Sequence, residues 1–138
     1  PNTWGQILNN HIGGEIVTND LDRTVDFYTN VLGFNTKLTQ RIDPSSLGVP
    51  INIVYLKLGG SAVELIWYEG AAIAPAPTGE QLGYRMMAIE VEDMTEAVAY
   101  LKAKGVDLSW GPRVFEDRYA RAEIRDPNGN RIELRQWF

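Results

Sequence analysis

The sequence predicts an α+β fold built from two consecutive modules, each with the element order β-α-β-β-β. Each half of the chain contains a helical pattern that opens at an aspartate and closes at a glycine, and each half ends in a strand that carries a glutamate. The matching positions are Asp20 and Asp93, Gly33 and Gly105, and Glu64 and Glu133. These pairs are 73, 72 and 69 residues apart, a drift that differences in loop length produce. Features that recur at a nearly constant separation indicate an internal duplication.

Length and composition are those of a globular chain with a small excess of negative charge. Its 138 residues, 44% hydrophobic and 22% charged, suit a single domain over residues 1–138. The net charge of -5 and the lack of a basic run argue against nucleic acid as a partner. No apolar stretch approaches the roughly 20 residues of a membrane helix, and the polar N-terminus has no signal-peptide core, so we expect a cytoplasmic protein. The absence of cysteine excludes disulfides, thiolate catalysis and cysteine-based zinc sites.

Module one is predicted over residues 11–69 and begins with a strand over residues 11–18. Gly13 and Gly14 loosen the middle of this strand. A helix capped by Asp20 follows, with apolar side chains at helical spacing. Runs of β-branched and aromatic residues then predict strands over residues 34–42, 51–58 and 61–68.

A stretch rich in alanine, proline and glycine over residues 70–83 predicts a linker, and module two follows over residues 84–138. Asp93 and Glu96 form a capping-box-like start for its helix. The remaining pattern predicts strands over residues 86–92 and 106–110, a loop over residues 110–119, and a hairpin over residues 119–137. The loop mixes glycine, charged and aromatic residues, so we expect it to act as a lid.

The last hairpin determines which way Glu133 points. Asn128 and Gly129 are expected to supply the positive φ angles of a two-residue turn. After the turn, apolar residues alternate with polar ones, which is the period of a half-buried strand. Ile132 and Leu134 should therefore face a packed layer, while Glu133 points the other way, onto a solvated surface or into a cavity.

Three segments, over residues 17–34, 88–93 and 126–134, read VTNDLDRTVDFYTNVLGF, AIEVED and DPNGNRIEL. With them the chain resembles the vicinal oxygen chelate superfamily, also called the glyoxalase/bleomycin resistance/dioxygenase superfamily, over essentially its whole length. The resemblance implies two βαβββ modules that form a half-barrel cavity for a small-molecule ligand, usually completed in a homodimer. The superfamily includes isomerases, epimerases, lyases, dioxygenases, thiol transferases and drug-sequestering binders, so the fold does not choose among these functions.

The metal pattern of this family places one ligand on the first strand and one on the last strand of each module. The resemblance puts the last-strand ligands at Glu64 and Glu133, and the first-strand ligands at Gly13 and Met86. Glycine offers no side chain and the methionine thioether is too soft for an oxygen-rich site, so we do not expect the usual four-ligand metal site. A divalent metal ion is an alternative if Glu15 or His11 joins the two glutamates, in a set suited to Mg²⁺ or Mn²⁺.

Without a metal, the two glutamates are left to act as acid and base. Two carboxylates that face each other across a cavity repel one another, and this raises at least one pKa. Such a carboxylate can transfer a proton at a carbon next to a carbonyl. We therefore expect an isomerase, epimerase or lyase with Glu64 and Glu133 as catalytic residues. The alternative is that both glutamates are structural and hydrogen-bonded to arginines.

Strand parity and composition also indicate a substrate-binding surface. Its candidate residues are Asn52, Tyr68, Met86, Trp110, Tyr119 and Arg131. Aromatic rings suit an apolar or planar ligand, and an arginine can hold a carboxylate or phosphate through two hydrogen bonds. The same surface on an acidic chain also suits a metal-free binder of bleomycin-resistance type that traps a cationic drug. A third hypothesis is a divalent-metal-dependent lyase or dioxygenase.

Overall fold

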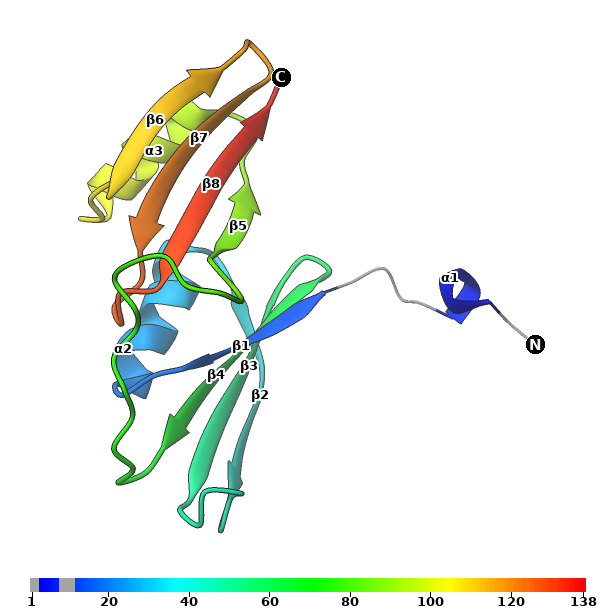
Figure 1. The fold of residues 1–138 in the computed structure, drawn as a ribbon, viewed down its shortest axis with the longest axis vertical. Helices are drawn as coiled ribbons and strands as arrows, with labels where there is room; N and C mark the ends of the chain where they lie inside the picture. The colour runs from blue at the N-terminus through cyan, green and yellow to red at the C-terminus, as the bar shows by residue number, and fades with distance from the viewer. Residues whose placement is uncertain (1–2, 8–11) are drawn as a thin grey trace. The chain divides into compact units, whose positions relative to one another are not determined.

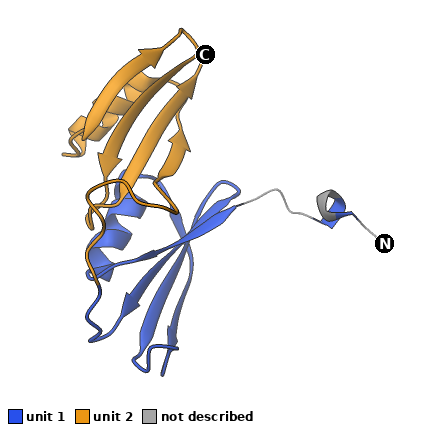
Figure 2. Ribbon diagram, viewed as in Figure 1, with its two compact units in different colours: residues 1–73 blue, residues 74–138 orange. Residues whose placement is uncertain are grey.

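The computed structural model describes residues 3–7 and 12–138, which form two compact units (Figures 1 and 2). Residues 1–73 belong to the first unit and residues 74–138 to the second. The boundary between them falls inside the predicted linker. No helix of the described residues has the length and apolar character required to cross a bilayer.

The first unit is built on a four-stranded mixed sheet (Figure 1). Its elements are α1 (Trp4–Ile7), β1 (Gly13–Val17), α2 (Leu21–Asp26), the π-helical turn η1 (Phe27–Val31), β2 (Asn35–Ile42), β3 (Ile51–Leu58) and β4 (Ser61–Tyr68). The strand order is β1-β4-β3-β2, with β1 parallel to β4 and the other pairs antiparallel. As predicted, Asp20 caps α2, because its side chain accepts a hydrogen bond of 3.2 Å from the backbone N–H of Arg23.

The second unit repeats this arrangement. Its elements are β5 (Met87–Glu90), α3 (Met94–Ala103), β6 (Trp110–Phe115), β7 (Tyr119–Arg125) and β8 (Arg131–Trp137). The strand order β5-β8-β7-β6, with β5 parallel to β8, is the order of the first sheet. Asp93 caps α3 by accepting a hydrogen bond of 3.0 Å from the backbone N–H of Glu96. The predicted α+β fold with two βαβββ modules is confirmed.

The central strands of the first unit carry apolar side chains on both faces. One face holds Leu56 and Leu65, which are fully buried, as is Tyr28 of η1. The register pairs Glu64 with Tyr55, so these two side chains share the opposite face. That face also holds an apolar cluster of Ile51, Ile53, Ile66, Tyr55 and Tyr68. Glu64 therefore stands beside apolar side chains, where a charged carboxylate is poorly solvated.

The sheet of the second unit has one apolar and one polar face. Ile132 and Leu134 are 1% and 3% exposed, and both lie on the apolar face. Gln136 shares that face, and its side-chain oxygen accepts a hydrogen bond of 2.8 Å from the backbone N–H of Met94 at the start of α3. The helix therefore covers the apolar face. Glu133 lies on the other face, as the alternation along the strand predicts.

The predicted strand over residues 106–110 and the predicted lid over residues 110–119 are wrong. The strand in this region is β6, which pairs with β7 at the edge of the sheet. Gly111 and Pro112, residues that typically mark loops, hid this strand from the sequence pattern. Both lie between Trp110 and Arg113, where the pairing with β7 has a bulge.

Two consecutive residues with positive φ angles occur at a different hairpin from the one predicted. Between β6 and β7, Glu116 and Asp117 have φ angles of 52° and 54°, which fit a type I′ turn. Between β7 and β8, Gly129 has a φ of 86°, but Asn128 is not in the left-handed region. Asp126 organises this longer loop by accepting a hydrogen bond of 2.9 Å from the backbone N–H of Asn128.

Candidate functional site

In the first unit, two glutamates and a tyrosine lie side by side on the face of the sheet that holds the apolar cluster. Glu15 of β1 and Tyr55 of β3 are the register partners of Glu64 on either side of β4. Burial raises the pKa of Glu64, and a hydrogen bond with Glu15 and the charge of Glu15 raise it further, while a hydrogen bond with Tyr55 lowers it. The net result is a pKa above the ordinary value for a glutamate, which is the property that a general acid or base requires.

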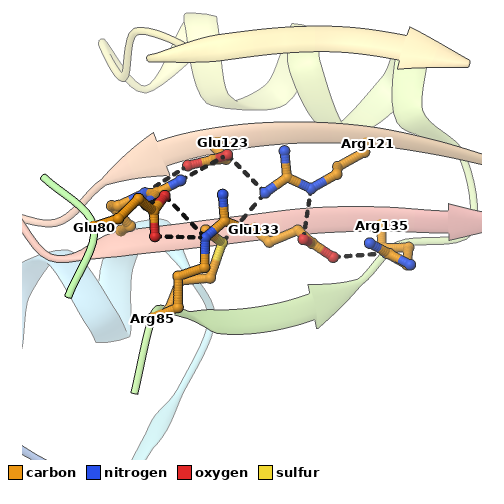
Figure 3. A network of polar contacts seen from close by, with 8 residues as sticks. Glu80, Arg85, Arg121, Glu123, Glu133 and Arg135 are labelled. Carbon is orange, nitrogen blue, oxygen red and sulfur yellow. Dashed lines mark hydrogen bonds and ion pairs between the residues drawn. The ribbon is translucent and has the colours of Figure 1, made fainter. Parts of the chain in front are cut away.

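The equivalent glutamate of the second unit has the opposite environment (Figure 3). Glu133 accepts hydrogen bonds of 2.6 Å from Nε of Arg121 and 2.6 Å from Nε of Arg135, one at each carboxylate oxygen. Burial raises the pKa of Glu133, but the hydrogen bonds and charges of the two arginines outweigh it, so the pKa lies below its ordinary value. Glu133 is therefore held in its ionised form.

Glu123 extends this network along β7. Its carboxylate forms an ion pair of 2.6 Å with Nη2 of Arg121 and a hydrogen bond of 2.9 Å with Nε of Arg131. Across the strands, the register sets Glu123 opposite Glu133 and Arg121 opposite Arg135, which would be repulsive. The attractive contacts run along each strand and diagonally between the strands instead, so each glutamate is bound by arginines and not by its register partner.

Arg121 and Glu123 are absent from the residues that the sequence indicates. The available signal is the alternation along β7, where charged residues alternate with Ala120, Ala122 and Ile124, all of them buried. That pattern is the same half-buried period that places Glu133 on the polar face. It could have placed Arg121 and Glu123 beside Glu133.

Four aromatic rings lie in a row on the same face. Trp110 stacks on Phe115 with centroids 6.2 Å apart, and Phe115 stacks on Tyr119 at 5.2 Å. Trp137 completes the row 5.3 Å from Tyr119. The guanidinium of Arg121 lies 4.9 Å from the centroid of Trp110, and that of Arg135 lies 4.4 Å from the centroid of Tyr119. The polar face thus combines aromatic rings with fixed cations.

The predicted substrate-binding residues lie in several different environments in the structure. Tyr68 packs on the apolar cluster of the first unit, on the face that holds Glu64. Asn52 lies on the opposite face of that sheet, where its amide nitrogen is buried without a partner among the described residues. In the second unit, Trp110 and Tyr119 lie in the aromatic row, while Arg131 is paired with Glu123 and Glu80 and Met86 contacts Arg121.

The residues present do not fit the four-ligand metal site of the family. The sulfur of Met86 accepts a hydrogen bond of 3.3 Å from Nη2 of Arg121, and the same guanidinium donates to Glu133. A guanidinium therefore links the two positions that would hold a metal in the second module. Gly13 provides no ligand, and within the described ranges no three acidic, histidine or cysteine side chains gather closely enough to hold a metal ion. His11 lies outside the described residues.

A repeated βαβββ fold with a glutamate on the last strand of each module defines a known class of proteins. The chain belongs to the Glyoxalase/Bleomycin resistance protein/Dioxygenase superfamily, whose model matches residues 9–134. No match was found among curated proteins.

Solved structures share the fold over nearly the whole chain. A glyoxalase family protein from Bacillus cereus is 24% identical, with 99% of each chain covered and a TM-score of 0.79. Glyoxalase I from Leishmania major is 25% identical over 91% of this chain and 84% of its own, with a TM-score of 0.67. An antibiotic binding protein from a Streptomyces species is 22% identical over 96% of this chain and 98% of its own, with a TM-score of 0.69.

Proposed function

We propose that the protein is an enzyme that moves a proton on a small oxygenated organic molecule, as an isomerase, epimerase or lyase. The observation that carries the proposal is the position of Glu64, which stands in register between Glu15 and Tyr55 on a partly apolar face. A carboxylate in this setting holds its proton more tightly than one in water. It is therefore suited to accept a proton as a general base and to return it as a general acid.

In this proposal the side chains have separate roles. Glu64 removes a proton from a carbon next to a carbonyl group and returns it to the product. Burial and the neighbouring Glu15 keep the proton affinity of Glu64 high, and Tyr55 is its register partner on β3. Glu133, the second residue of the proposed catalytic pair, stays ionised and fixes the two arginines that bind it.

A metal-free binding protein is the second candidate function. The row of aromatic rings with guanidinium groups on their faces favours it, since such a surface can retain a planar molecule without reacting with it. The likeness to an antibiotic binding protein is in keeping with this function. The guanidinium groups already lie on the rings, so they favour a neutral or anionic ligand over a cationic one.

Hydrogen exchange separates the two functions. A panel of small 2-oxo acids, 2-hydroxy acids and aldehydes is incubated with the protein in D₂O, and loss of the proton next to the carbonyl is followed by ¹H NMR. The enzyme should catalyse exchange for at least one compound, and Glu64→Gln and Glu133→Gln should each abolish it. Glu116→Gln is the control, because Glu116 lies in the exposed β6–β7 turn. Full activity in both Gln variants, or binding without exchange, contradicts the proposal.

We propose that the two modules act as one domain, with a small molecule as ligand, in a cytoplasmic homodimer. The family to which the chain belongs and the absence of a membrane-spanning helix in the described residues support this setting.

A further inference from the structure

Glu133 binds Arg121 and Arg135 through the same nitrogen of each guanidinium group. Each guanidinium is bound through its Nε, which is the nitrogen nearest to the side-chain stem. An arginine held in this way keeps its terminal nitrogens for other partners. Glu133 is only 10% exposed in its side chain, so the carboxylate is an internal anchor for both cations.

The terminal nitrogens are only partly used. Nη2 of Arg121 contacts Glu123 and Met86, but Nη1 of Arg121 has no hydrogen-bond partner in the described part of the chain. Arg135 has no partner for either terminal nitrogen among the same residues, and its guanidinium lies over two aromatic rings. The side chains of Arg121 and Arg135 are 12% and 23% exposed, so the unused N–H groups can be reached from outside.

The aromatic row restricts what can approach these donors. Arg121 lies over Trp110, and Arg135 lies over Tyr119 and Trp137. A flat ligand can contact the rings while an oxygen atom reaches the guanidinium groups. Two guanidinium groups with free N–H bonds match the two oxygens of a carboxylate.

The net charge of the groups on this face favours an anionic ligand over a neutral one. Three arginines and three glutamates are joined by ion pairs on this face: Arg121, Arg131, Arg135, Glu80, Glu123 and Glu133. Arg85, which binds Glu80, and Arg113, which lies over two rings of the aromatic row, add two positive charges. Glu90, which accepts a hydrogen bond from Trp137, adds one negative charge. The network therefore carries a slight positive excess, and this favours an anion.

We propose that Arg121 and Arg135, anchored by Glu133, form a subsite for the carboxylate of a planar ligand. The proposal rests on the proposed function only in taking this face to bind the small molecule, and it narrows that molecule to a carboxylic acid. Glu133 acts here as a positioning residue, and the two arginines bind the ligand. Neither the proton-transfer step nor Glu64 is needed for this binding.

The test is a calorimetric titration with benzoate as an unreactive probe, with benzamide and acetate for comparison. The protein should bind benzoate saturably, and should bind benzamide and acetate at least about tenfold more weakly, since they lack the charge and the ring respectively. Arg135→Gln should weaken benzoate binding by about tenfold or more. Arg121→Lys keeps the charge but loses the planar donor group, and it should weaken binding as well.

Arg118→Gln is the matched control. Arg118 lies in the exposed β6–β7 turn, where its side chain is 78% exposed and forms an ion pair with Glu116. Its benzoate affinity should equal that of the unmodified protein, and the melting temperature of each variant shows whether it is folded. Equal affinity for benzoate and benzamide, or unchanged affinity in folded Arg135→Gln and Arg121→Lys, would overturn the proposal. Glu64→Gln should still bind benzoate, so a failure of the proton-transfer hypothesis can be distinguished from a failure of the carboxylate subsite.

Discussion

Glu15 and Glu64 are register partners on the parallel strands β1 and β4, so two carboxyl groups lie side by side in the first unit. At the equivalent positions of the second unit, Glu133 has Ala88 as its partner on β5 and is bound by two arginines instead. The duplicated strand has kept the same residue in both modules, but its neighbours have opposite electrostatic effects. The pKa of Glu64 is raised and that of Glu133 is lowered.

Glu64→Gln should stabilise the protein at neutral pH. A carboxyl with a raised folded-state pKa contributes stability below its unfolded pKa of about 4.3, and that contribution is lost as the pH rises through the folded pKa. The neutral amide avoids the cost of burying a charge and removes the repulsion from Glu15, so the melting temperature should rise at pH 7 by a small amount. The gain should vanish near pH 4, and a loss of stability at pH 7 would contradict the assigned environment.

Glu133→Gln should have the opposite effect. Because the folded-state pKa of Glu133 is lowered, its contribution is present above the unfolded pKa of about 4.3 and is lost as the pH falls through the folded value. Removing the charge leaves two partly buried guanidinium groups without their shared partner, at a cost of roughly 3 kcal/mol at pH 7. Urea unfolding of the variant and of the unmodified protein, at pH 7 and at low pH, measures the loss of stability and its dependence on pH. An equal loss of stability at the two pH values would refute this account.

Gly111→Ala should destabilise the second unit more than Gly129→Ala. Both glycines have positive φ angles, 74° and 86°, so both substitutions carry the backbone penalty of about 1–2 kcal/mol. A Cβ at Gly111 would also lie 2.7 Å from the carbonyl oxygen of Arg121, whereas nothing lies within 4 Å at Gly129. The difference between the two variants in urea unfolding therefore isolates the steric clash. Equal losses would mean that β6 shifts freely on β7.

Divalent metal ions should not stabilise the unmodified protein. The guanidinium of Arg121 links Met86 and Glu133, and a metal would have to displace it. Melting temperatures should therefore be the same with EDTA and with added Mn²⁺, Zn²⁺ or Ni²⁺, since a ligand that binds the folded state raises the melting temperature. A clear rise that disappears in Glu133→Gln would show that Glu133 is a metal ligand and would favour the metal-dependent hypothesis.

The protein should be a homodimer in solution. Light scattering coupled to size-exclusion chromatography should give about twice the chain mass of 15.5 kDa. A mass of one chain at all concentrations would contradict the prediction.

The amino-acid sequence by itself determined the architecture and much of its detail. The hairpin strands Ile51–Leu58 and Ser61–Tyr68 have the predicted bounds, and the caps at Asp20 and Asp93 are present. These features depend on local periodicity, capping and turn chemistry, which neighbouring residues encode. The β6 strand was missed because a bulge with Gly111 and Pro112 breaks the local pattern that such predictions use.

The tertiary structure decided which charges meet. Alternation placed Glu64 and Glu133 on their faces, but it could not show that Glu64 stands beside Glu15, or that Arg121 reaches Glu133 and Met86 together. Those contacts join strands that are far apart in the sequence or depend on long side chains. A period of two residues specifies the face of a strand and not its register or the rotamers of its side chains. The sequence therefore determined the chemical groups on each face, and the strand register decided that one glutamate holds its proton more tightly while its counterpart stays ionised.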